Sequence, residues 1–172
     1  MTPPIQHNSE EEDWLVVLDP GWTATDTEPE PPVTALVGGW RVHEDGTAGP
    51  FEPNPQYMPL DGATPSDPID AILRRIVAGE PLAEELLTTI QNSIIEVACH
   101  TIDQPAVTDA PDGRPCIVVA TATLQKTGIQ VAGWQALVGA NLGDITPAGV
   151  DILINPVGSA PFRLHANRIR KQ

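Results

Sequence analysis

The stretch Val150-Asp151-Ile152-Leu153-Ile154-Asn155 is the clearest strand in the chain, and Pro156 ends it. β-branched and aliphatic residues favour extended structure, and proline interrupts it. Side chains alternate between the two faces of a strand, which predicts that Asp151 faces away from the core. A second strand of the same kind is Cys116-Ile117-Val118-Val119-Ala120-Thr121-Ala122, after a turn at Asp112–Pro115. These patterns predict a β-rich C-terminal half.

Weaker patterns extend outward from these two strands. We expect further strands at residues 93–100 and 134–138, and a brief last strand at 162–164. Residues 141–145 can form one helical turn, and the basic tail 166–171 can be helical.

The N-terminal part shows an apolar run at Trp14–Leu18, closed by the turn signal Asp19-Pro20-Gly21, which predicts a buried strand. A second apolar stretch at 33–43 leads into Glu44-Asp45-Gly46, a hairpin turn that tolerates positive φ. Gly38-Gly39 within this stretch indicates a bulge or a close backbone approach.

Two short amphipathic helices are predicted in tandem. Asp67 can cap the first helix, with Pro68 at its first position. Ile69, Ile72, Leu73 and Ile76 form its apolar stripe, and Asp70, Arg74 and Arg75 lie largely off that stripe. Gly79 stops this helix, and Pro81 starts the second one. In the second helix Leu82, Leu86, Leu87 and Ile90 face inward.

The chain is strongly acidic, with nine Lys and Arg against 23 Asp and Glu in 172 residues, a net charge of −14. Residues 1–80 carry 15 acidic and three basic residues, a net charge of −12. This balance argues against a nucleic-acid partner, because Lys and Arg supply the affinity for phosphates. It fits a solvated face or an acidic surface that steers a basic protein partner.

No apolar run approaches the roughly 20 residues of a membrane span, and the N-terminus lacks a secretory signal pattern. We therefore expect a cytoplasmic protein without membrane insertion. Twelve of the 19 prolines lie in residues 1–68, which predicts strands joined by long extended loops there.

Strands in runs, with the helices set apart, indicate an α+β fold. We expect a central, mostly antiparallel sheet with a few short helices packed on it. Residues 1–12 are predicted to form a disordered acidic tail. Residues 13–92 form a Pro-rich acidic segment with two short helices, and residues 93–172 form the β-rich half of what we expect to be one continuous domain.

Three segments resemble a known family. Leu36–Pro55, with its Gly-Gly-Trp, Asp-Gly and Phe-Glu-Pro-Asn-Pro motifs, resembles the N-terminal signature of actinobacterial type VII secretion system-associated proteins, and Asp67–Asp70 continues the resemblance. Gly149–Pro156, followed by Gly158 and Pro161–Leu164, is similar to the end of a strand in the SseB-like domain of the same proteins. The resemblance implies an α+β domain, SseB-like over residues 93–172, on the cytoplasmic side of an ESX secretion locus. It carries over no catalytic residue.

The residues offer little catalytic chemistry. His7, His43, His100 and His165 are far apart in sequence. Cys99 and Cys116 can meet if their strands pair, which leaves open a zinc site with His100, a disulfide, or two small buried hydrophobic side chains. Without C-x-x-C spacing or a fourth ligand, and in a reducing compartment, buried thiols are favoured. We therefore expect no enzyme, no metal site and no cofactor.

Tyr57–Asp61 matches the Y-x-x-x-D pattern of type VII substrates. The helical hairpin with a W-x-G turn that accompanies this pattern is missing from the chain. Pro55 and Pro59 also oppose a helix there. We interpret the match as chance.

Trp22 stands in a loop beside the acidic residues Asp26, Glu28 and Glu30. Exposed aromatic residues are common at binding hot spots, so these four residues form the predicted partner-binding surface. The favoured function is a non-enzymatic protein-binding accessory, adaptor or chaperone-like, of a type VII secretion system. It binds its protein partner by charge complementarity or by strand addition at a sheet edge. The alternative is an immunity-type or regulatory protein that binds a basic effector toxin.

Overall fold

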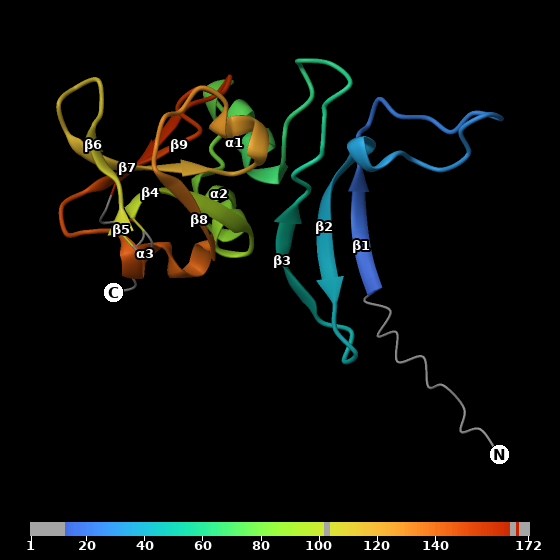
Figure 1. Ribbon diagram of the computed structural model, residues 1–172, viewed down its shortest axis with the longest axis horizontal. Coiled ribbons are helices and arrows are strands. Elements are labelled where there is room, and N and C mark those ends of the chain that lie inside the picture. The colour runs from blue at the N-terminus through green and yellow to red at the C-terminus, as the bar shows by residue number, and fades with distance from the viewer. Residues whose placement is uncertain (1–12, 102–103, 166–167, 169–172) are drawn as a thin grey trace.

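A computed structural model describes residues 13–101, 104–165 and 168 (Figure 1). It confirms the α+β fold class: in this part of the chain, three short α-helices accompany mostly antiparallel strands in two sheets. The predicted tail 1–12 lies outside the described residues. So does the C-terminal segment 166–171, apart from Arg168.

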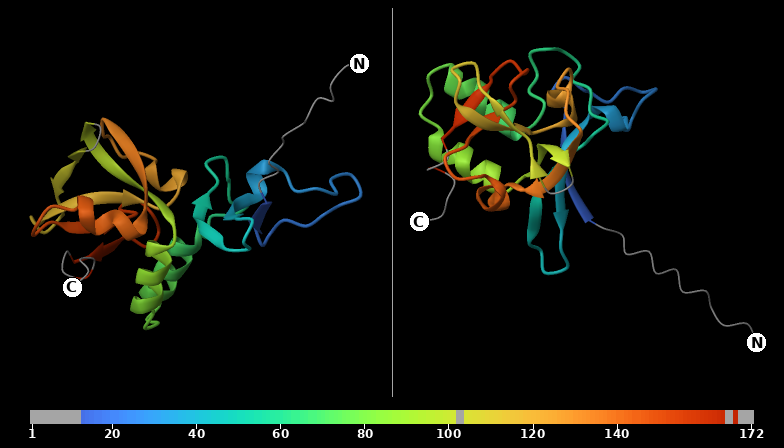
Figure 2. Two further views of the ribbon diagram at one scale, coloured as in Figure 1. Left: turned by 90° about the horizontal axis from the view of Figure 1, so that it is seen from below. Right: turned by 60° about the vertical axis from the view of Figure 1, so that its left-hand side comes forward.

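Residues 13–53 form a small antiparallel sheet with the strand order β1-β2-β3. The strands are β1 (Asp13–Leu18), β2 (Leu36–Val42) and β3 (Ala48–Pro53), and a short 3-10 helix, η1 (Val33–Ala35), precedes β2. This sheet stands beside the rest of the molecule, with β1 as its outermost strand (Figures 1 and 2).

The glycines of β2 make the close approach that the sequence indicates. A Cβ atom on Gly38 would lie 2.4 Å from the carbonyl oxygen of Glu52 in β3. A Cβ atom on Gly39 would lie 2.6 Å from the carbonyl oxygen of Leu15 in β1. The predicted hairpin turn also forms, with Gly46 at φ 79°.

The other strands form a large sheet in which β4 and β7 are central. These strands are β4 (Ile94–Thr101), β5 (Gln104–Pro105), β6 (Val107–Asp109), β7 (Pro115–Ala120), β8 (Gly133–Val138), β9 (Asp151–Ile154) and β10 (Phe162–Leu164). β4 and β7 pair only around Val97 and Val119; farther along, β5 pairs with β4 and β6 pairs with β7. β7 and β9 are parallel. The sequence patterns did not predict β5 and β6, because these short segments carry mainly polar residues and proline.

Helices cover one face of the large sheet. They are α1 (Pro68–Val77), α2 (Ala83–Gln91) and α3 (Leu142–Ile145), with the short 3-10 helix η3 (Gly139–Asn141). Another 3-10 helix, η2 (Thr123–Lys126), follows β7. The main core joins apolar side chains of the helices to those of the central strands: Ile69, Leu73, Leu86, Ile90, Ile95, Val97, Ile117, Val119, Ile152 and Ile154. Each such side chain contributes about 1.5–3 kcal/mol through its burial.

Two predictions of burial are wrong in opposite directions. The strand at Trp14–Leu18 forms, but it is not buried, since no other element of the described residues covers β1 on its outer side. Asp70 and Asp151 were expected off the core and are only 0% and 9% exposed. Asp151 lies 3.2 Å from the Nδ1 atom of His165, and this residue follows the neighbouring strand β10.

Candidate functional site

β1 is an open and apolar sheet edge. Among the described residues it pairs with β2 alone. Four of its six side chains are large, apolar and exposed: Trp14 (40%), Leu15 (59%), Val16 (49%) and Leu18 (38%). Natural proteins usually protect an edge strand with charges, proline or a covering element. β1 has only Asp13 at its start, so its edge is available for pairing.

A shallow groove of about 450 Å³ runs along one face of this edge. Trp14 and Val16 of β1 form one wall, and Val33 and Leu36 continue the apolar surface. Gly39, which is opposite Val16 in the pairing of β1 with β2, has no side chain to fill the groove. We call this surface, together with the outer edge of β1, the β1 face.

Two other edge strands lack this combination of features. β3 contains Pro50 and Pro53, and its Phe51 forms a bridge with Ser93 at the start of β4. β8 is also at an edge, but none of its large apolar side chains is exposed. Among the described edge strands, β1 is therefore distinguished by several exposed large apolar side chains, whereas β6 exposes one, Val107 (42%).

A buried carboxylate fixes the end of β1. Asp19 is 1% exposed and accepts hydrogen bonds from the amide of Gly21 (2.7 Å), the hydroxyl of Tyr57 (2.8 Å) and the amide of Leu60 (3.1 Å). Burial opposes ionisation of Asp19, but these three hydrogen bonds outweigh it and hold the pKa of Asp19 below its ordinary value. Burial and the nearby Asp19 carboxylate raise the pKa of Tyr57. Tyr57, the first residue of the Y-x-x-x-D match, is therefore a buried structural side chain.

The predicted partner-binding residues lie next to the β1 face. Trp22 is half-buried in the turn after β1, where its amide donates to the carbonyl of Asp19. Asp26, Glu28 and Glu30 are exposed in the loop 23–32, which projects beyond the small sheet (Figure 1). We call residues 23–32 the acidic loop. The sequence identified the residues of the acidic loop as candidates for partner binding. It did not identify the exposed apolar side chains of β1, because β1 was expected to be buried.

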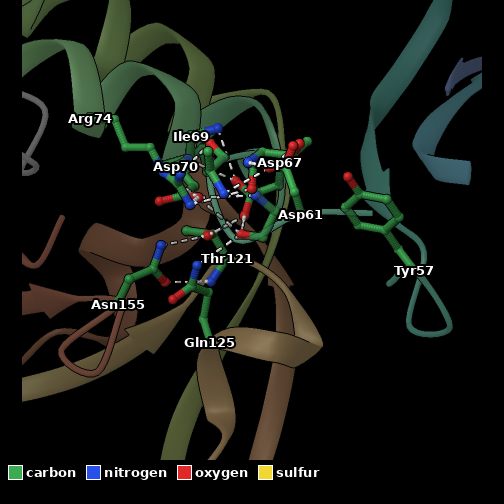
Figure 3. Close-up of polar contacts among 12 residues, drawn as sticks. Tyr57, Asp61, Asp67, Ile69, Asp70, Arg74, Thr121, Gln125 and Asn155 are labelled. Carbon is green, nitrogen blue, oxygen red and sulfur yellow. Dashed lines mark hydrogen bonds and ion pairs between the residues drawn. The ribbon is translucent and has the colours of Figure 1, made fainter. Parts of the chain in front are cut away.

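A second group of polar side chains meets at the carboxyl ends of the parallel strands β7 and β9 (Figure 3). We call it the polar anchor, and its members are Ser66, Asp67, Asp70, Thr121, Gln125 and Asn155. All six side chains are buried.

Asp67 is the centre of the polar anchor. Its Oδ1 atom accepts from the amides of Ile69 (2.9 Å) and Asp70 (3.0 Å), which confirms the predicted N-cap of α1. Its Oδ2 atom accepts from the hydroxyls of Ser66 and Thr121, each at 2.7 Å. Burial raises the pKa of Asp67, and the hydrogen bonds that it accepts act against that rise.

The two hydroxyl groups each receive a second hydrogen bond from a side-chain amide. Asn155 donates to the hydroxyl of Thr121 at 2.8 Å, and Gln125 donates to the hydroxyl of Ser66 at 2.8 Å. Asn155 also accepts from the amide of Thr121 and has a positive φ of 48°. The chain of donors thus runs from amide to hydroxyl to carboxylate and ties α1 to the ends of β7 and β9.

Asp70 connects the polar anchor to Arg74. The Nη2 atom of Arg74 lies 2.9 Å from the Oδ2 atom of Asp70, and that oxygen also accepts from the amide of Ser66. The Oδ1 atom of Asp70 has no hydrogen-bond partner in the described structure. A pocket of about 440 Å³ lies beside this group, lined partly by Ser66, Arg74 and Gln125. The Ser66 hydroxyl, the Arg74 guanidinium and the amide nitrogen of Gln125 make hydrogen bonds within the protein, so the polar anchor holds the chain together.

Cys99 and Cys116 are both buried free thiols, as the favoured interpretation of the sequence had it. Their strands β4 and β7 do pair, but only around Val97 and Val119, so the two cysteines are not paired with each other. Cys99 pairs with Pro105 and Gly133, whereas Cys116 pairs with Thr108 and Asp151. Burial raises the pKa of the Cys116 thiol.

Within residues 13–101, 104–165 and 168, no group of three or more His, Cys, Asp or Glu side chains is arranged to hold a metal ion. None of the helices in the same residues has the length and apolar character to cross a membrane. Comparison of the chain with protein-family models, curated proteins and solved structures gives no match.

Proposed function

We propose that the chain is a non-enzymatic protein-binding accessory, adaptor or chaperone-like, that acts on the cytoplasmic side of a type VII secretion system. The observation that carries the binding role is the β1 face, where a regular edge strand leaves apolar side chains exposed. Exposed apolar surface of this kind marks interaction sites. The secretion context comes from the resemblance of Leu36–Pro55 and Gly149–Leu164 to proteins associated with that system.

The polar anchor supports a binding role over a catalytic one. Its hydroxyl groups donate to a carboxylate that also caps a helix, so they are committed to stabilising the fold. A nucleophile needs a base that is free to take its proton at a site that a substrate reaches. Ser66 and Thr121 are 4% and 2% exposed.

An immunity-type protein that binds a basic effector toxin is the second candidate. The acidic loop favours it, since Asp26, Glu28 and Glu30 are exposed with no Lys or Arg between residues 14 and 40. An acidic surface steers a basic partner and raises the association rate. The two candidates differ in the number and the affinity of their partners.

The test is crosslinking affinity purification of the tagged protein from its native cell, with mass spectrometry of the captured proteins. An adaptor captures secretion components or several of their substrates, and Val16→Asp in the β1 face abolishes the capture. Val77→Asp is the matched control, because Val77 is an exposed valine at the end of α1, away from β1. One tightly bound basic protein assigns the immunity role instead. Equal capture by the two variants would remove the support from the β1 face.

A further inference from the structure

Within the part of the chain that the structure describes, the outer edge of β1 has no neighbouring strand. Five consecutive residue pairs, from Asp13↔Val42 to Val17↔Gly38, run in regular antiparallel register before the first shift at Leu18. Alternate residues of such a strand direct their N–H and C=O groups away from the paired side. Six residues span about 20 Å, which is enough to pair with one short strand.

The side chains beside this edge set the chemistry of an added strand. Trp14 and Val16 line the groove on one face, and Leu15, on the other face, is 59% exposed. A neighbouring strand would place its own side chains within contact of these residues on both faces. The middle of that strand therefore has to be apolar.

The charges near the two ends of β1 determine which residues should flank the apolar middle of the added strand. Asp13 stands exposed at the start of β1, and the acidic loop follows shortly after its end. The only Lys or Arg in residues 13–53 is Arg41, which lies over the ring of Trp14 (5.3 Å) and 3.9 Å from Glu52. Both ends of β1 thus present negative charge, which lysine or arginine on a partner complements.

The same charges argue against a second copy of this chain as the occupant. Two β1 strands that pair with two-fold symmetry run antiparallel, so the start of each lies beside the end of the other. Asp13 of one copy would then approach the acidic loop of the other, and like charges would meet twice.

From these observations we infer that β1 accepts an extended segment of a partner protein as a fourth strand of the small sheet. The segment is apolar in its middle and carries lysine or arginine at its ends. This inference rests on the proposed protein-binding function and adds the conformation and the charge of the bound segment. Main-chain hydrogen bonds supply affinity in this mode, and the side chains supply selectivity.

The test uses a phage-displayed library of random nonapeptides, selected on the full chain. Enriched peptides are expected to have apolar centres and basic ends. For a selected peptide made synthetically, fluorescence anisotropy should show a loss of affinity of about tenfold or more on Val16→Asp and little change on Val77→Asp. N-methylation of alternate peptide amides should weaken binding similarly, because it removes donors to the strand edge. Neutralising Asp26, Glu28 and Glu30 together, as Asn, Gln and Gln, should weaken binding most at low salt.

Other results would overturn the inference. One such result is that the selected peptides bind the Val16→Asp variant as tightly as they bind the parent protein. Another is that the selected peptides are acidic. A third is that N-methylation of the peptide leaves its affinity unchanged. A parent protein that sediments as a dimer, and as a monomer after Val16→Asp, would assign the edge to a second copy. If the native-cell experiment captures partners whose crosslinks lie outside the β1 face, the binding function stands and the strand-addition inference fails.

Discussion

The change of Asp67 to alanine measures what the polar anchor contributes to stability. Loss of the N-cap of α1 costs about 1 kcal/mol. The hydroxyl of Thr121 loses its acceptor inside the protein, which costs about 1–3 kcal/mol. The hydroxyl of Ser66 keeps an alternative acceptor, since it lies 3.5 Å from the Oδ2 atom of Asp70. Together the two losses predict a decrease of about 2–4 kcal/mol in the free energy of unfolding.

Urea unfolding followed by circular dichroism tests this value. With a slope of about 2 kcal/mol per molar urea, the midpoint should fall by about 1–2 M. Asp45→Ala is the matched control, because Asp45 also accepts from an amide and a hydroxyl, both of Thr47, but in an exposed turn. Its midpoint should change by less than about 0.5 M. Equal shifts of the midpoint for the two variants would refute the claim that burial and long-range contacts make Asp67 contribute more to stability than Asp45 does.

Two further predictions concern packing and charge. Gly139→Ala should lower the free energy of unfolding in urea by several kcal/mol, because the added Cβ atom would lie 1.9 Å from the carbonyl oxygen of Ile90. Gly133→Ala is the control and should be nearly neutral, because the space around Gly133 is open. Similar urea midpoints for the two variants would contradict the packing argument. Arg163→Gln removes the ion pair with Asp112 (2.8 Å), a partly exposed contact whose effect on stability should be small. The pair lowers the pKa of Asp112 to about 2, below its unfolded value, so its contribution is present above about pH 4 and disappears as the pH falls through about 2. Urea midpoints of parent and Arg163→Gln should therefore converge between pH 4 and pH 2, and a constant difference over that range would show that the charge pair is not its source.

Local patterns predicted the elements better than they predicted what covers them. The start of α1 was predictable because Asp67 accepts from amides of the same turn and the fixed φ of Pro68 suits the first helical position. Exposure of β1 was not, since Trp14–Leu18 has the composition of a core strand, and it is exposed because no other described element covers it.

The polar anchor shows a second limit of local patterns. Asp67 meets Thr121 across 54 positions in the chain, and Thr121 meets Asn155 across 34. A polar residue directly after a buried strand is a weak signal at either position. The signal becomes meaningful only once β7 and β9 are known to be parallel neighbours whose ends meet the start of α1.

The division of the strands between the two sheets has a consequence for folding. The small sheet is contained within residues 13–53, whereas the first strand of the large sheet, β4, begins at Ile94. During synthesis the N-terminal sheet is complete before any strand of the large sheet has been made. The exposed apolar side chains of β1 are therefore accessible while the rest of the chain is still being synthesised. At that stage they can bind chaperones or lead to aggregation.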